Sequence, residues 1–183
     1  MSLFRRFRRD ERGVSAIEFA LIAPFMILLY FGLVELCQAL IAERKASHVA
    51  SAVGDLVAQS ESVTMAAGGS GPTSLVDIYS IGASIMAPFA TTDLKIGVTS
   101  VTADANGKPI VDWSNAYNGY PVQKAGTTAT LPMTLSAGDS IVMAQASYAY
   151  KSGIGYVLPQ AQTFTESFYL RPRRSDKVTC ADC

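Results

Sequence analysis

The fold of this chain is decided by residues 12–35, which read RGVSAIEFALIAPFMILLYFGLVE. Residues 14–34 are apolar apart from Ser15 and Glu18. As a helix that rises about 1.5 Å per residue, this stretch would be about 31 Å long, and the hydrocarbon core of a bilayer is about 30 Å thick. The sequence therefore predicts a transmembrane helix over residues 14–35.

The charges around this helix predict its orientation. Residues 1–13, which we call the leader, carry a net charge of +3, because five arginines outnumber Asp10 and Glu11; the arginines are Arg5, Arg6, Arg8, Arg9 and Arg12. By the positive-inside rule, the leader faces the cytoplasm and everything after Glu35 lies outside. A basic segment confined to one end does not predict nucleic-acid binding, which needs a basic face on the folded part.

Two other kinds of N-terminal segment remain open. A cleaved secretory signal peptide has an apolar region of about 7–15 residues, shorter than this one, and would be cut near Ala39 or Ala42. Lipoprotein processing at Cys37 is disfavoured, because the three residues before the cysteine are large or charged.

Pro24 lies inside the predicted helix. A proline there removes one backbone hydrogen bond and clashes with the preceding turn, so we expect a helix kink or local melting at Pro24. Such a bend is equally compatible with an ordinary membrane anchor and with a helix shaped for packing in a filament.

Four features coincide at the junction of leader and helix: the basic leader, Gly13 at the boundary, Glu18 five residues later, and the apolar helix itself. The stretch from Arg12 to Pro24 resembles the TadE-like family, the pseudopilins or minor pilins of the bacterial Flp or tight-adherence (Tad) pilus system. The resemblance implies that a prepilin peptidase cuts after Gly13. Val14 would then be the new N-terminus, Glu18 the fifth mature residue and Phe19 the aromatic residue that follows it.

Glu18 has a functional and a structural interpretation. A carboxylate inside an apolar segment is costly, which makes it a candidate functional group with a partner to be found. Cleavage after Gly13 would create that partner, the α-ammonium of Val14, and the resemblance implies that the glutamate neutralises this amine on an adjoining subunit during assembly. Alternatively, Ser15 and Glu18 fit the S-x-x-E capping box of a helix start. Both interpretations can hold together.

Beyond Glu35 the helix is expected to continue to about Gln59, as an exported stalk over residues 36–61. Apolar residues recur there at intervals of three and four, which is typical of an amphipathic helix; they are Leu36, Leu40, Ala46, Val49, Ala50, Val53, Leu56 and Val57. We expect this face to pack on the exported domain or on other subunits.

Residues 62–183 predict an exported α+β domain with an antiparallel sheet of about four strands and a second helix. The glycine-rich residues 62–74 predict a flexible loop, and residues 75–87 an amphipathic helix. Alternating apolar residues, with a turn signal at Asn106-Gly107, predict strands at residues 94–99, 109–113, 139–151 and 162–171. The hairpin and the stretches 146–148 and 169–173 also look like the C-terminal part of TadE-like proteins, with less specific motifs.

The sequence predicts no enzyme, no cofactor and no metal. It has no phosphate-binding glycine loop, no catalytic triad pattern and no metal-ligand cluster, and its one histidine, His48, has no ligand companions. Cys180 and Cys183, in the exported tail, are expected to form a disulfide or to stay free rather than to act in redox chemistry. The basic residues nearby are expected to be a solvated tail rather than a site for anionic surfaces; they are Arg171, Arg173, Arg174 and Lys177.

These features lead us to expect a minor pilin or pseudopilin of the inner membrane, possessing a single transmembrane helix and acting in pilus assembly or initiation through helix–helix packing. Its partners would be a prepilin peptidase, other pilin or pseudopilin subunits, inner-membrane Tad assembly proteins and membrane lipid. The alternative is an uncleaved, membrane-tethered binding module of the secretion or pilus apparatus. Cleavage of the bond between Gly13 and Val14 distinguishes the two.

Overall fold

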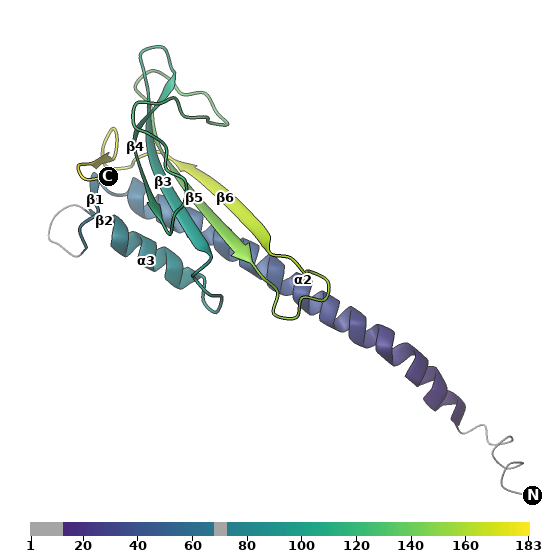
Figure 1. Cartoon of the computed structure of the whole chain (residues 1–183). Helices are drawn as coiled ribbons and strands as arrows, with labels where there is room; N and C mark the ends of the chain where they lie inside the picture. The colour runs from purple at the N-terminus through teal and green to yellow at the C-terminus, as the bar shows by residue number, and fades with distance from the viewer. Residues whose placement is uncertain (1–12, 68–72) are drawn as a thin grey trace, which may run out of the picture.

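The computed structural model describes residues 13–67 and 73–183, which form two helices and seven strands (Figure 1). The helices are α2 (Val14–Ala58) and α3 (Leu75–Ile85). The strands are β1 (Ser62–Thr64), β2 (Thr73–Ser74), β3 (Leu94–Ala103), β4 (Pro109–Tyr117), β5 (Ser140–Tyr150), β6 (Gln162–Leu170) and β7 (Thr179–Cys180). The predicted basic leader, apart from Gly13, and the glycine-rich residues 68–72 lie outside the described residues.

The main sheet has four antiparallel strands in the order β4-β3-β5-β6. With α2 and α3 it makes the α+β fold that the sequence predicted. The turn between β3 and β4 contains Asn106 and Gly107, as expected. Gly107 has a φ of +77°, a left-handed conformation that glycine adopts without strain. The carboxylate of Asp104 accepts hydrogen bonds from the N–H groups of Asn106 and Lys108 (2.8 and 2.9 Å), so this aspartate serves the turn.

A second, small sheet corrects the prediction of a loop over residues 62–74. β1 pairs in parallel with β2 on one side and with β7 on the other. Val63 in β1 is buried, and its register partner in β7 is Cys180. Strands of two or three residues are too short to show an alternating pattern, and β1 finds its partner more than a hundred residues later in the chain, so the sequence could not reveal them.

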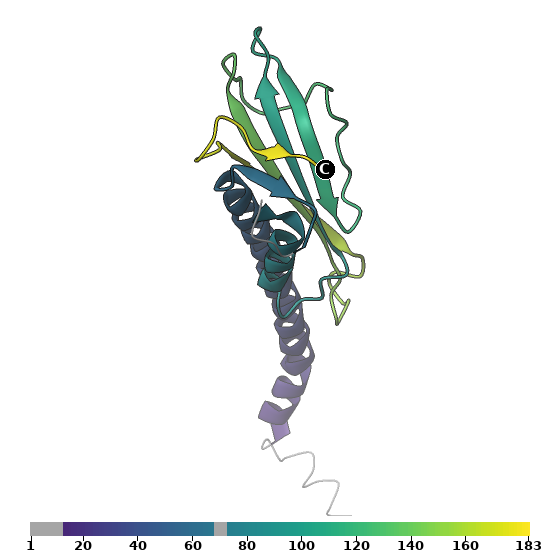
Figure 2. The same ribbon diagram turned by 90° about the vertical axis from the view of Figure 1, so that its left-hand side faces the viewer.

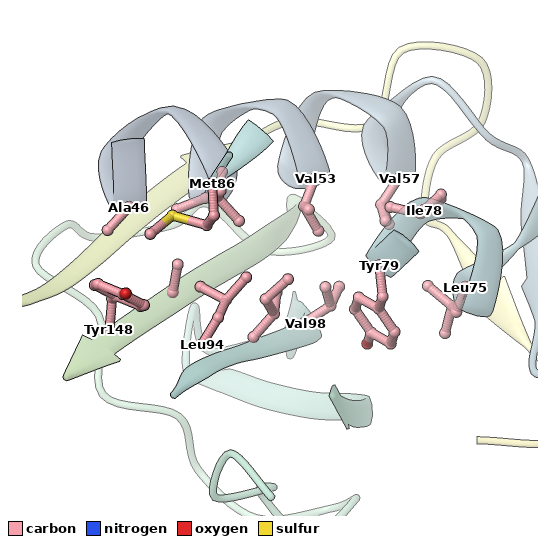
Figure 3. Packing of buried hydrophobic residues seen from close by; sticks show 14 of the residues in the cluster. Ala46, Val53, Val57, Leu75, Ile78, Tyr79, Met86, Leu94, Val98 and Tyr148 are labelled. Atoms are coloured by element: carbon pink, nitrogen blue, oxygen red, sulfur yellow. The ribbon is translucent and has the colours of Figure 1, made fainter. Parts of the chain in front are cut away.

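Both helices cover the same face of the main sheet (Figure 2). α2 packs on β5 and β6 and also against α3. Figure 3 shows the apolar layer between helices and sheet. Its labelled side chains are Ala46, Val53 and Val57 of α2; Leu75, Ile78 and Tyr79 of α3; Met86, which directly follows α3; Leu94 and Val98 of β3; and Tyr148 of β5. Two glycines permit this close approach. A Cβ at Gly54 would lie 2.6 Å from Leu170 Cδ1, and one at Gly82 would lie 2.9 Å from Val53 Cγ2.

The buried face of α2 begins at Glu35 and follows the period of a helix. Its buried residues are Glu35, Ala39, Ala42, Ala46, Val49, Ala50, Val53, Gly54, Val57 and Ala58. The prediction that Leu36 and Leu40 belong to this face was wrong, since both are about half exposed (49% and 48%). Ala39 and Ala42 occupy the buried face instead.

Candidate functional site

The N-terminal half of α2, Val14–Val34, extends away from the domain (Figure 1). None of its residues is buried, and its large apolar side chains point outward on every side; the more exposed ones include Ile17, Phe19, Leu21, Phe25, Leu29, Tyr30 and Leu33. α2 is long and apolar enough to cross a membrane. Among the described residues, only the β5–β6 loop lies beside this half, along its last turns. A helix that is apolar all round and largely uncovered by protein suggests a membrane anchor.

α2 continues through Pro24 without interruption, so the local melting considered for this position is absent. The whole helix is gently curved in Figure 1. A kink at Pro24 itself stays a prediction.

The junction at Gly13 corrects the capping-box interpretation. α2 begins at Val14, and Gly13 is its N-cap residue, with no side-chain hydrogen bond to the helix start. Ser15 therefore lies inside the first turn, one residue too late to act as the cap. Glu18 makes no hydrogen bond or ion pair with any described residue, so within residues 13–67 and 73–183 its carboxylate has no structural task.

Gly13 is also free of steric constraint. An added Cβ would meet no atom within 4 Å, and the φ of −87° suits any residue. The fold of the described chain therefore gives no reason for a glycine here.

Glu35, at the end of the apolar run, is the residue whose role the sequence did not reveal. Only 1% of it is exposed, and its carboxylate accepts four hydrogen bonds from the loop between β5 and β6. The donors are the Ser152 hydroxyl (2.7 Å) and the N–H groups of Tyr156 (2.8 Å), Val157 (2.6 Å) and Leu158 (3.2 Å). The carboxylate thus fastens this loop to α2 at the point where the helix leaves the domain.

Gly32 lies one turn before Glu35 and faces the same loop. A Cβ at this position would lie 3.1 Å from Val157 Cγ2, so the glycine leaves room for the valine against the helix. The one sequence signal for this contact was the position of Glu35, a carboxylate at the border of an apolar segment. Its donors lie 117 to 123 residues further along the chain, and nothing local announces them.

The basic side chains of the C-terminal tail are exposed to solvent, as expected, but the tail is also docked on the domain. Each of its basic residues has an acidic partner: Arg171 with Asp139 (2.9 Å), Arg173 with Asp55 (2.6 Å), Arg174 with Glu61 (3.5 Å) and Lys177 with Asp112 (3.5 Å). The indole N–H of Trp113 donates to the carbonyl of the buried Val178 (2.8 Å). The tail is therefore part of the fold, and its positive charges are largely paired.

The two tail cysteines, Cys180 and Cys183, form a disulfide. Asp182 lies beside them, and their three side chains are the group of candidate metal ligands among the described residues. Sulfurs joined in a disulfide are poor ligands, because the thiolate is the form that binds metal. The carboxylate of Asp182 instead accepts hydrogen bonds from the Thr64 hydroxyl (2.7 Å) and the Met65 N–H (2.9 Å), and the Thr64 bond is the main cause that lowers the pKa of Asp182.

The other predicted site residues are dispersed. Cys37 is exposed with a free thiol, and His48 is exposed on the stalk half of α2. The structure thus groups the functional candidates into two places. One is the Gly13–Phe19 junction, and the other is the contact of Glu35 with the β5–β6 loop.

Comparison with known proteins agrees with the first of these places. Residues 13–55 match the family model described as TadE-like protein, and this match begins at Gly13. No curated protein and no solved structure matches the chain. The match agrees with the resemblance seen in the sequence: over residues 13–55 the chain is similar to TadE-like proteins, which suggests a pilin-like protein that is associated with a Tad pilus and anchored in a membrane.

Proposed function

We propose that this protein is a minor pilin or pseudopilin of a Tad-type pilus, which a prepilin peptidase processes between Gly13 and Val14. In this proposal α2 crosses the inner membrane once with the leader in the cytoplasm, and the β-rich domain is exported. The processed protein then acts in pilus assembly or initiation by packing α2 against the helices of other subunits. Its role is structural rather than catalytic.

The observation that carries this proposal is the coincidence of three features at Gly13. The family match begins there, the helix begins at the next residue, and the fold itself makes no demand for glycine at that position. A signal that is read by a peptidase explains all three.

The surroundings of Glu18 support the assembly step. The carboxylate lies among exposed apolar side chains such as Ile17 (64% exposed) and Phe19 (73%), and no described residue of the chain satisfies it. In a membrane or a bundle of helices, such a group needs a counter-charge. A free α-ammonium on Val14 of an adjoining subunit, produced by cleavage, would supply one.

The test is the intact mass of the protein recovered from membranes of a host that co-expresses a prepilin peptidase. We expect the wild type to lack Met1–Gly13. The matched control is Gly13→Ala, which the structure accommodates without a clash, so an uncleaved Gly13→Ala protein would report loss of recognition and not loss of folding.

Two further arms complete the test. Glu18→Gln should still be cleaved but should assemble poorly with wild-type subunits, because it removes the charge and keeps the side-chain shape. A full-length mass for the wild type would overturn the proposed processing and favour the uncleaved, membrane-tethered binding module.

A further inference from the structure

The loop between β5 and β6, residues 151–161, exposes apolar side chains close to α2. Ile154 is 52% exposed, Tyr156 64% and Val157 48%. An exposed group of large apolar side chains on a folded domain commonly marks a contact with a membrane or with another protein. The position of these side chains along α2 indicates that the loop contacts a membrane rather than another protein.

The helix residues that lie beside the β5–β6 loop show how deep the loop would lie in a bilayer that α2 crosses. Ile154 and Tyr156 line one groove together with four helix residues: Pro24, Ile27, Leu28 and Phe31. These residues lie four to eleven positions before Glu35, which corresponds to about 6–16 Å along the helix axis. When α2 spans a core about 30 Å thick and leaves it near Glu35, that depth falls in the half of the bilayer nearest the domain.

The backbone N–H groups of the loop are hydrogen-bonded within the protein, which suits an environment without water. The N–H groups of Ile154 and Gly155 donate to the Ser152 hydroxyl oxygen (3.3 and 3.2 Å). Those of the next three residues donate to Glu35, and Pro159 has no N–H. Six consecutive residues therefore present no unsatisfied donor, although they form neither helix nor strand. Unpaired backbone N–H groups are strongly disfavoured in lipid, so this arrangement removes one obstacle to insertion.

The side-chain chemistry points the same way. Residues 152–165 contain no charged side chain, and the exposed Lys151 stands at the entry of the loop, where it can meet lipid phosphates. Tyrosine is favoured at the membrane interface, because its ring is apolar and its hydroxyl is polar.

We propose that the β5–β6 loop is a second membrane-contacting element, in which Ile154, Tyr156 and Val157 enter the lipid leaflet on the domain side and Glu35 holds the loop against α2. The domain would then sit at a fixed height on the membrane before assembly. This inference rests on the proposed membrane-spanning role of α2.

Site-directed spin labelling tests the proposal on the full chain in vesicles of phosphatidylethanolamine and phosphatidylglycerol. In a Cys37→Ser background, which removes the free thiol and keeps the tail disulfide, single labels are placed through Ile154→Cys and Tyr156→Cys. Leu29→Cys is the reference for lipid and Asn106→Cys, at the distant β3–β4 turn, the reference for water. Power saturation then compares the access of oxygen, which concentrates in lipid, with that of a water-soluble nickel chelate.

Labels at 154 and 156 are expected to favour oxygen, as the label at 29 does, at a depth of about 5–10 Å below the headgroups. Labels at 154 and 156 that behave like the one at 106, while the label at 29 lies in lipid, would overturn this inference and leave the anchor intact. A label at 29 that lies in water would instead overturn the membrane-spanning role of α2. If labels at 154 and 156 had low access to both reagents, and this access fell as the protein-to-lipid ratio rose, the loop would contact another protein molecule. That result would also overturn the proposal.

Discussion

Residues 14–34 and 35–58 of α2 belong to one unbroken helix, yet only the second half contributes buried residues to the core of the domain. The first half is apolar on every side and has no buried residue. The second half buries one stripe, made mostly of alanine and valine, against the sheet and α3. The comparison shows that one continuous helix can carry two different surfaces: the first half is suited to a bilayer by its length and apolar content, and the second half is held by a domain core.

The change from one half to the other takes place at Glu35. Before it, neighbouring protein touches α2 through the β5–β6 loop, whose Val157 approaches Gly32. From Glu35 onward the helix enters the core. A carboxylate can stand at this border because four donors satisfy it.

The largest effects are expected from two single variants, one in each half of α2, that place an aspartate on an apolar surface. Val53→Asp places an unpaired carboxylate at a fully buried position and should destabilise the domain by about 3–5 kcal/mol or more. Ile22→Asp should leave the unfolding of the domain unchanged and weaken membrane insertion by about 2.5–3.5 kcal/mol. Thermal unfolding in detergent and carbonate extraction of membranes measure the two effects. If Ile22→Asp also lowered the unfolding temperature, the two halves would not be independent.

A smaller effect is expected at the border. Glu35→Gln replaces one carboxylate oxygen by an NH2 group, which cannot accept the N–H groups that converge there. We expect a loss of about 2 kcal/mol of local stability, or about thirtyfold faster hydrogen exchange at Tyr156, Val157 and Leu158. Glu43→Gln, a change of the same kind further along α2 at a residue with no such partners among the described ones, is the control. Unchanged exchange at the three amides would contradict the role of Glu35.

The smallest losses of stability are expected from alanine substitutions at two glycines of α2, and they should differ between the two positions. Gly54→Ala would put a Cβ 3.0 Å from the fixed Ala144 Cβ and 2.6 Å from Leu170, and should cost about 1–3 kcal/mol in spite of the better helix propensity of alanine. Gly32→Ala meets only Val157, at 3.1 Å on a loop that can yield, so its overall change in stability should stay within about 1 kcal/mol. Denaturant unfolding compares them, and equal losses would mean that the loop is packed as rigidly as the sheet.

Local patterns were enough for much of the fold. The apolar run, the period of the stalk and the turn at Asn106-Gly107 predicted α2, the antiparallel sheet and the hairpin close to their observed positions, because each depends on neighbouring residues. The parallel β1-β2-β7 sheet was missed, since its strands are two or three residues long. The exposure of Leu36 and Leu40 was missed because spacing identifies a stripe without giving its exact edge.

The candidate site divides in the same way. The motif from Gly13 to Phe19 can be read from the sequence alone, because its residues are contiguous and the peptidase signal that we propose would be linear. The sequence also determined that the first half of α2 is suited to a membrane, since length and apolar content decide that property. Only the tertiary structure decided that Glu35 binds the β5–β6 loop, that Ser15 does not cap the helix and that the basic tail is paired. Those outcomes depend on groups that folding brings together from distant parts of the chain, or on the residue at which the helix begins, and neither is fixed by a local pattern.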